Sequence, residues 1–170
     1  MAEIQRYDVV ENYPGFQLRR YAPHTIVTKS MTGSMAQAGS NAFGYLAGYI
    51  SGQNERGQAI AMTAPVLQKK TQVGYEVSFV MPADLENAPA PRSGLELSNV
   101  DSKLMAAIKF SGSASEELFA RKANQLIEAA VASGLKVIGD PLYARYNGPW
   151  TPPLLRRNEV LVEVEATTAQ

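Results

Sequence analysis

The stretch "AIAMTAPVLQKK" (59–70) constrains the fold more than any other segment, because Pro65 divides a hydrophobic strand into two parts. Proline has no backbone N–H, so within a sheet it is confined to edges, bulges and strand ends. The stretch "YARYNGPWTPPLL" (143–155) is similar, since prolines again interrupt a run of strand-forming residues. Both stretches therefore predict places where a strand bends at a corner of a curved or closed sheet.

The order of the predicted elements occurs twice along the chain. The first half contains two alternating strands, a helix, the divided strand and a final strand (16–21, 25–33, 40–50, 59–69 and 75–82). The second half repeats this order (95–100, 103–112, a helix after Ser113, 143–155 and 157–165). We expect one domain, 1–170, with half-repeats of about 15–82 and 95–165 joined by a Pro-rich connection, 82–94. Short strands that outnumber the helices predict an α+β fold, a distorted antiparallel β-barrel with two flanking helices and a pseudo-twofold internal repeat.

Helical periodicity assigns a core-facing side to each predicted helix. Ser113 and Glu116 have the spacing of a capping box at the start of the second helix. The side chains predicted to face the core are Phe43, Leu46, Ala47 and Ile50 in the first helix, and Phe119, Ala123, Leu126 and Ala130 in the second.

The composition excludes several kinds of chemistry. The chain has no cysteine and one histidine, His24, so disulfides, thiolate metal sites and zinc sites with several histidines are excluded. Its 16 basic and 16 acidic residues give no general attraction to nucleic acid. No apolar run is long enough for a membrane span, and the first ten residues lack a signal-peptide pattern. We expect a cytoplasmic, soluble protein that is not an enzyme, without nucleic-acid binding or membrane insertion.

Four segments together resemble the SOUL, or haem-binding protein, family: "FQLRRYAPHTIV", "AFGYLAGYISGQNERGQAIAMTAPV", "YEVSFVMP" and "YARYNGPWTPPLLRRNEVLVEV". The resemblance extends from about Tyr7 to Val164. It implies a distorted antiparallel barrel with two outer helices. It also implies non-covalent binding of haem or a related tetrapyrrole in a shallow apolar groove beside the first helix. Similar folds serve as effector-binding domains of bacterial transcription regulators.

The resemblance also bears on how iron would be held. Some family members have a histidine directly before the Tyr that is Tyr21 here, and this chain has Arg20 in that position. His24 follows Pro23, where we expect an exposed turn residue rather than an iron ligand. We therefore expect binding without strong axial ligation and predict no metal site, with His24 as the one weak candidate.

The first helix contains features that suit a flat ligand. Gly44 and Gly48 form one strip on the helical wheel, and Tyr45 and Tyr49 form the next. Each glycine costs about 0.5–1 kcal/mol of helix stability relative to alanine, so two of them call for a reason. One interpretation is a shelf on which a macrocycle lies against the backbone, with tyrosine rings at its edge. The alternative is close packing of the helix on a strand or a partner protein.

The resemblance places the loop "NGPWTPPLLRR" across from this shelf. Trp150 and Leu154 would form an apolar wall, and Arg156 and Arg157 would bind the propionates of haem. The alternatives are that the loop plugs one end of the barrel, and that at least one of the arginines pairs with Glu159 or Glu76.

The predicted function is therefore tetrapyrrole binding, as a buffer, carrier or delivery protein. The alternative is a non-enzymatic binding module for another flat apolar molecule or for a partner protein.

Overall fold

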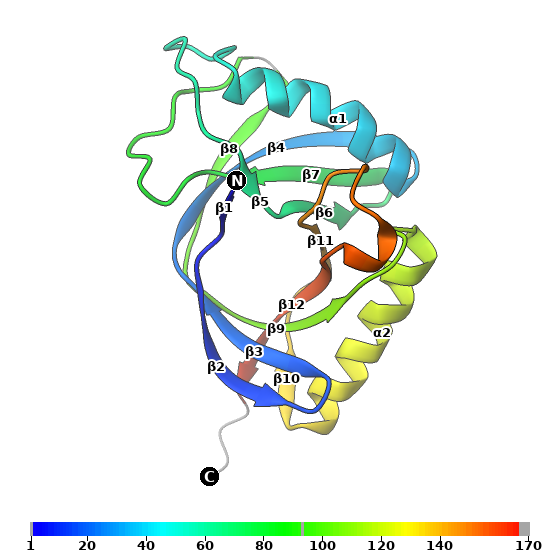
Figure 1. The fold of residues 1–170 in the computed structure, drawn as a ribbon. Coiled ribbons are helices and arrows are strands. Elements are labelled where there is room, and N and C mark those ends of the chain that lie inside the picture. Colours follow the sequence, from blue (N-terminus) through cyan, green and yellow to red (C-terminus); the bar gives the residue numbers. More distant parts are fainter. Residues whose placement is uncertain (1, 93, 167–170) are drawn as a thin grey trace. The chain divides into compact units, whose positions relative to one another are not determined.

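The structure is a computed structural model that describes residues 2–92 and 94–166. The chain forms two compact units, unit 1 (Met1–Arg6 and Pro23–Asp101) and unit 2 (Tyr7–Ala22 and Ser102–Gln170). Each unit combines an antiparallel sheet with one long helix (Figure 1). The predicted α+β class with two helices is therefore confirmed.

Unit 1 has a four-stranded antiparallel sheet in the order β8–β4–β7–β6. Helix α1 packs on β4, β7 and β6 of this sheet. A separate parallel pair joins β1 to β5. The bounds are β1 Glu3–Ile4, β4 His24–Thr32, α1 Met35–Ile50, β5 Thr63–Ala64, β6 Val66–Lys70, β7 Gly74–Val80 and β8 Glu96–Val100.

Unit 2 has an antiparallel sheet in the order β2–β3–β9–β12–β11, and β10 also pairs with β12. Helix α2 packs on β9, β10 and β12. The bounds are β2 Tyr7–Tyr13, β3 Phe16–Tyr21, β9 Lys103–Phe110, α2 Glu116–Ala132, β10 Leu135–Val137, β11 Leu142–Arg145, the 3-10 turn η1 Pro153–Leu155, and β12 Asn158–Ala166.

The two sheets have the same order when elements are matched by their place in the two half-repeats. The order β8–β4–β7–β6 in unit 1 corresponds to β3–β9–β12–β11 in unit 2. Each unit thus takes one strand of this order, β8 in unit 1 and β3 in unit 2, from the other half of the chain. Among the described residues neither sheet closes on itself, so open sheets replace the predicted barrel.

Pro65 lies where the divided strand changes partner. Before it, β5 pairs with β1 in a separate two-stranded sheet, and after it, β6 pairs with β7, so the strand is interrupted at this proline as predicted. Thr63, Ala64 and Pro65 are buried, whereas Met62 is only half-buried and precedes the strand. The second Pro-containing stretch differs, because β11 ends at Arg145 and the prolines lie in a loop beyond it.

Both helices begin at a serine cap. In α1 the Ser34 side chain accepts from the Gln37 N–H, and the Gln37 side chain accepts from the Ser34 N–H, which completes a capping box. In α2 the cap is Ser115 rather than the predicted Ser113, and Glu116 and Glu117 lie in the first turn, where the helix dipole favours negative charge.

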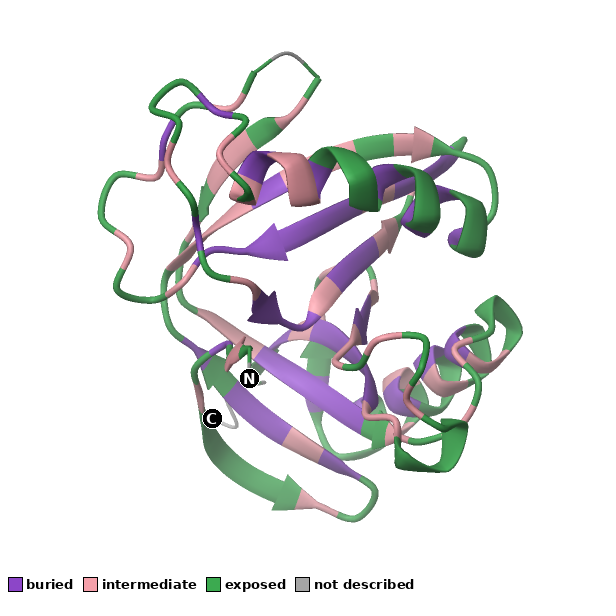
Figure 2. Ribbon diagram, turned by 45° about the horizontal axis from the view of Figure 1, so that its top comes forward, coloured by how far each residue is buried: buried purple, intermediate pink, exposed green. Residues whose placement is uncertain are grey.

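The buried face of α2 is the predicted one, whereas in α1 only Leu46 of the four predicted residues is fully buried. Phe119, Ala123, Leu126 and Ala130 are buried as expected. In α1 the predicted Phe43 is 49% exposed. Its ring contacts the ring of Phe79 on β7, with an angle of 65° between the two ring planes. Figure 2 shows the outer side of α1 exposed over buried strands. The buried residues of α1 are Met35, Ala38, Gly39, Ala42, Leu46 and Tyr49.

The phase error in α1 has a steric cause. The helix begins at Met35, before the predicted start, and its buried face is rich in Ala and Gly. Small side chains let the helix axis approach the sheet closely, so the face that packs is not the one with the largest hydrophobic residues. A prediction that places the large hydrophobic residues toward the core therefore assigns the wrong side of α1 to the sheet.

Candidate functional site

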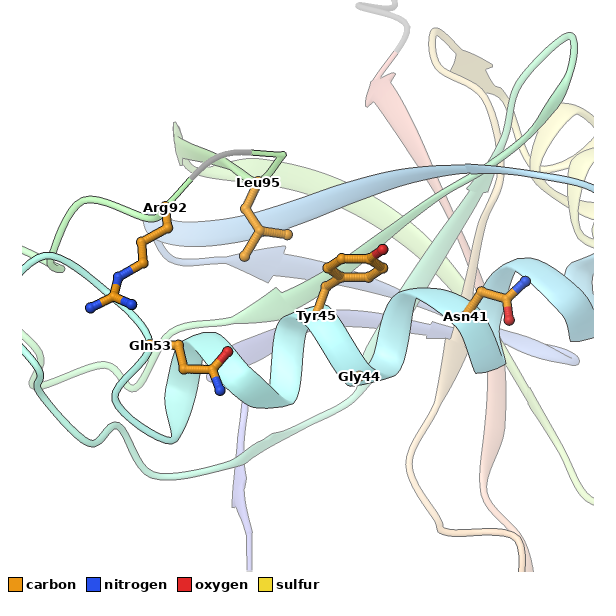
Figure 3. Close-up of a pocket in the computed structure, with 6 residues that line it drawn as sticks. All are labelled: Asn41, Gly44, Tyr45, Gln53, Arg92 and Leu95. Atoms are coloured by element: carbon orange, nitrogen blue, oxygen red, sulfur yellow. The ribbon is translucent and has the colours of Figure 1, made fainter.

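A pocket of about 350 Å³ lies beside α1 in unit 1 (Figure 3). Helix α1 contributes three lining residues, the turn after it contributes one, and the loop before β8 contributes two. The lining residues are Asn41, Gly44, Tyr45, Gln53, Arg92 and Leu95. The pocket is thus built where a helix face meets the connection between β7 and β8.

Gly44 and Gly48 have different surroundings. A Cβ atom added at Gly44 would meet nothing within 4 Å, so no packing contact explains this glycine. A Cβ added at Gly48 would lie 2.6 Å from the Oε1 of Gln53. The Gln53 N–H also donates to the Gly48 carbonyl at 2.9 Å. Gly48 therefore allows a turn to pack against the helix, whereas Gly44 leaves a bare stretch of backbone in the pocket.

The two tyrosines of the predicted shelf separate in the same way. Tyr45 is 55% exposed and lines the pocket, with its ring extending from α1 toward Leu95 (Figure 3). Tyr49 is a correction to the predicted site, because it is 1% exposed and its hydroxyl donates to the Pro89 carbonyl. Burial raises the pKa of the Tyr49 phenol. Tyr49 fixes the Pro-rich connection to the helix and does not border the pocket.

Two cations border the pocket, and neither was predicted. Arg92 is a lining residue, and the Nζ of Lys29, on β4, lies 4.5 Å from the centre of the Tyr45 ring. None of the six lining residues is acidic. Within the described part of the chain, neither Arg92 nor Lys29 forms an ion pair with a carboxylate. A group bound here would therefore meet uncompensated positive charge next to an aromatic ring.

The predicted residues of unit 2 lie in one loop and at the start of β12. Trp150 and Leu154 are 86% and 85% exposed. The Arg156 guanidinium donates to the carbonyls of Thr151 and Pro149, so it holds the loop together. Arg157 donates to the Glu159 carboxylate at 2.9 Å and to the Tyr7 hydroxyl at 3.0 Å.

The pairing of Arg157 with Glu159 was the alternative considered from the sequence, and it is confirmed. Glu159 also binds Arg19, and the Tyr146 hydroxyl donates to it at 2.8 Å. Burial acts to raise the pKa of Glu159, but the hydrogen bonds and positive charges of Arg19 and Arg157 outweigh it and hold that pKa below its usual value. Glu159 is therefore an ionised carboxylate whose negative charge is compensated by two arginines within unit 2.

His24 does not lie in the predicted turn. It opens β4, pairs with Val100 of β8 and is half-buried. No cluster of three or more His, Cys, Asp or Glu side chains among residues 2–92 and 94–166 could hold a metal ion.

The family of the chain follows from a sequence model. The model of the SOUL heme-binding protein family matches residues 2–163. The chain belongs to this family. None of the curated proteins matches the chain in sequence.

Solved structures share the fold of this SOUL protein at low identity. The EcmrR C-terminal domain has a TM-score of 0.69 and 11% identity, over 95% of this chain and 99% of that one. EcmrR in a complex with DNA has a TM-score of 0.68 and 11% identity, over 91% of this chain and 59% of that longer one. A conserved protein from Listeria innocua has a TM-score of 0.58 and 10% identity, over 87% and 92% of the chains.

The SOUL family is described as heme-binding, so the pocket on α1 is a candidate ligand site. The predictions for Gly44 and Tyr45 concern residues that line this pocket, whereas Asn41, Gln53, Arg92 and Leu95 were missed as lining residues. Among the described residues of this SOUL protein, no helix is both long and apolar enough to cross a membrane.

Proposed function

We propose that the pocket on α1 binds a flat, anionic tetrapyrrole such as haem. The observation that carries the proposal is the open space over Gly44, beside the exposed ring of Tyr45. A planar macrocycle gains most contact where it lies against bare backbone and an aromatic side chain. A glycine that costs helix stability without a packing contact fits such a role.

The charges at the pocket suit the carboxylates of a tetrapyrrole. Arg92 presents a planar guanidinium that forms paired hydrogen bonds with a carboxylate, and Lys29 supplies a second positive charge beside Tyr45. Asn41 and Gln53 add amide groups that donate and accept hydrogen bonds. A cationic or strongly basic ligand would be repelled by the same two side chains.

The lining also supports binding that does not depend on the metal. Haem iron is held by His, Cys, Met or Tyr, and Tyr45 is the one such residue among the six that line the pocket. Binding of the tetrapyrrole would then depend on contacts with the face of its macrocycle and with its carboxylates. With no His, Cys or carboxylate in the lining, we propose a buffer, carrier or delivery role without chemistry of its own.

Titration of the purified protein tests this proposal. Hemin should bind in a saturable one-to-one manner, followed by its Soret absorption. Metal-free protoporphyrin should bind with an affinity within about threefold of that of hemin, which is less than 0.7 kcal/mol. Uptake that does not saturate would contradict the proposal, and a loss of affinity of a hundredfold without iron would show that a protein group ligates the metal.

The alternative is a non-enzymatic module for another flat apolar molecule or for a partner protein. Its support is the same exposed ring of Tyr45 beside an open stretch of helix. If neither hemin nor protoporphyrin saturates the protein while an uncharged planar dye does, this alternative is favoured. Trp150, Leu154, Arg156 and Arg157 stay predictions as tetrapyrrole contacts, and the proposal does not depend on them.

A further inference from the structure

Unit 2 exposes a group of large apolar side chains on one short segment, residues 147–157, which we name the Trp150 loop. Trp150, Leu154 and Leu155 are 86%, 85% and 73% exposed. Among residues 2–92 and 94–166, the other exposed large hydrophobic residues have lower exposed fractions, of which Val73 reaches 71%. Three such side chains within one short segment mark a candidate interaction surface, whereas scattered ones do not.

The Trp150 loop is ordered by hydrogen bonds within unit 2. The carbonyls of Pro149 and Thr151 accept from Arg156, and the carbonyl of Pro153 accepts from the Gly112 N–H at 2.8 Å. The Pro152 carbonyl accepts from Leu155 N–H at 2.9 Å. The prolines have no N–H to satisfy. The loop can therefore leave water with most of these polar groups already paired, and it loses little entropy on binding.

The charged side chains in and beside the Trp150 loop are mostly positive. The sequence from Pro141 to Asn158 contains Arg145, Arg156 and Arg157 and no Asp or Glu, although Arg157 pairs with Glu159 directly after it. The Arg156 guanidinium donates to two neutral carbonyls and forms no ion pair among the described residues, so its charge is not neutralised. Burial, followed by the positive charge of Arg156, lowers the pKa of Arg145, which agrees with cations gathered at this place.

We propose that the Trp150 loop docks on the surface of an anionic lipid membrane, with Trp150, Leu154 and Leu155 entering the interface and Arg156 facing the lipid phosphates. Tryptophan favours the headgroup level of a bilayer, and leucine favours the adjoining acyl region. Arginine charges near the surface are attracted to anionic lipids. A chain whose total charge is balanced can still dock in this way, because the attraction acts over about 10 Å and is therefore local.

The composition of the Trp150 loop favours a membrane over a protein partner. A docking site for a specific protein combines apolar anchors with polar groups that remain available for hydrogen bonds. In the Trp150 loop the carbonyls of Pro149, Thr151, Pro152 and Pro153 are already hydrogen-bonded within unit 2. Apolar side chains and the charge of Arg156 therefore make up much of what the loop presents to a partner, and these are the two properties that a headgroup region selects.

Trp150 is the only tryptophan of the chain, so it reports its own surroundings. The experiment adds ligand-free protein to vesicles of phosphatidylcholine and of a phosphatidylcholine–phosphatidylserine mixture. We expect the mixed vesicles to shift Trp150 emission to the blue and carry the protein in co-sedimentation. Lipids brominated near the headgroup should quench the emission. Because no tetrapyrrole is present, the result is independent of the proposed function.

Two variants separate docking by the loop from other binding. The double variant Leu154→Ser/Leu155→Ser keeps Trp150 and should bind the mixed vesicles at least about tenfold more weakly, since the two leucines that enter the lipid interface are lost. Val131→Ser, at a 58% exposed position of α2, is the matched control and should bind like the wild type. Equal melting temperatures would show that all three proteins are folded.

Three outcomes would overturn the proposal. The first is an emission maximum that stays unchanged with the mixed vesicles. The second is equal binding to vesicles with and without phosphatidylserine, which would remove the role of Arg156. The third is a blue shift that grows with protein concentration in the absence of lipid, which would show that the loop meets a second copy of the chain.

Discussion

Arg19 and Glu159 form a two-pronged ion pair although 140 residues separate them along the chain. Their Nη1–Oε1 and Nη2–Oε2 distances are both 2.8 Å, and their side chains are 2% and 0% exposed. The pair joins β3 to β12 within unit 2, and these are the two strands that flank β9. It therefore holds β3, a strand from the first half of the chain, against strands of the second half.

Further groups complete this buried cluster. Arg157 and Tyr146 also bind the Glu159 carboxylate, while the Tyr21 hydroxyl accepts from Arg19. Burial raises the pKa of Tyr21 to about 12. Two guanidinium groups thus share one carboxylate, and removal of that carboxylate would leave two buried or half-buried cations facing each other.

The first prediction is that Glu159→Gln lowers the free energy of unfolding by about 3–5 kcal/mol, because it breaks a buried pair and leaves Arg19 uncompensated. Urea unfolding measures this change. The control is Glu163→Gln, which removes a partly exposed pair with Lys103 and should cost less than about 1 kcal/mol. Equal effects of the two substitutions would show that the buried cluster contributes no more than a surface pair.

The second prediction concerns pH. The pKa of Glu159 is lower in the folded protein than its ordinary value of 4.5. A lowered pKa means that the unfolded chain takes up its proton first, so the stabilisation is complete above about pH 4.5 and is lost as the pH falls through the folded pKa. The stability difference between wild type and Glu159→Gln should be constant from pH 7 to about 5 and shrink below pH 4. A difference that stays constant down to pH 2 would contradict it.

Local patterns were sufficient for several elements of this fold. The alternation in 16–21 gives the bounds of β3, and periodicity gives the buried face of α2. Strand β2 was missed because Asp8 to Asn12 are exposed on both faces, so no alternation marks it. The pairing of β3 with β9, and of β8 with β4, could not be predicted, because these contacts join halves of the chain that carry no local signal for each other.

The candidate site was predictable to the same extent. Gly44 and Tyr45 stand out on a helical wheel, since glycine is costly in a helix. Arg92 and Leu95 lie in a Pro-rich connection that only the tertiary structure brings to α1, and Lys29 alternates in a strand like any solvent-facing residue. Arg19 was missed because a buried arginine becomes recognisable only when its distant carboxylate partner is known.

The third prediction assigns the carboxylates of the ligand to Arg92. Arg92→Gln should weaken hemin binding by about tenfold, or 1.4 kcal/mol, because a charged hydrogen bond to a carboxylate is lost. Binding of protoporphyrin dimethyl ester, which lacks free carboxylates, should change little. The control is Arg121→Gln, at an exposed position of α2, which should leave both affinities unchanged. Equal losses for the acid and the ester would place Arg92 against the ring rather than a carboxylate.

The fourth prediction is that His24→Ala leaves the Soret maximum and the affinity for hemin nearly unchanged. His24 opens β4 and is not among the residues that line the pocket. Its substitution therefore removes no ligand contact, whatever it does to stability. Absorption titration of the variant provides the measurement, and a tenfold loss of affinity with a shifted Soret band would make this imidazole an iron ligand.

The last prediction tests the bare backbone of α1. Gly44→Leu should fill the pocket and abolish saturable hemin binding, because the macrocycle could no longer reach the helix. Stability should rise by up to about 1 kcal/mol, since an added Cβ meets nothing within 4 Å and a helical glycine is removed. Ala36→Leu adds the same side chain at an exposed position of the same helix outside the pocket, so it should keep hemin affinity. Thermal unfolding and hemin titration of both variants separate the interpretations. A Gly44→Leu protein that binds hemin normally would place the ligand away from α1, and one that melts many degrees lower would make Gly44 a packing residue.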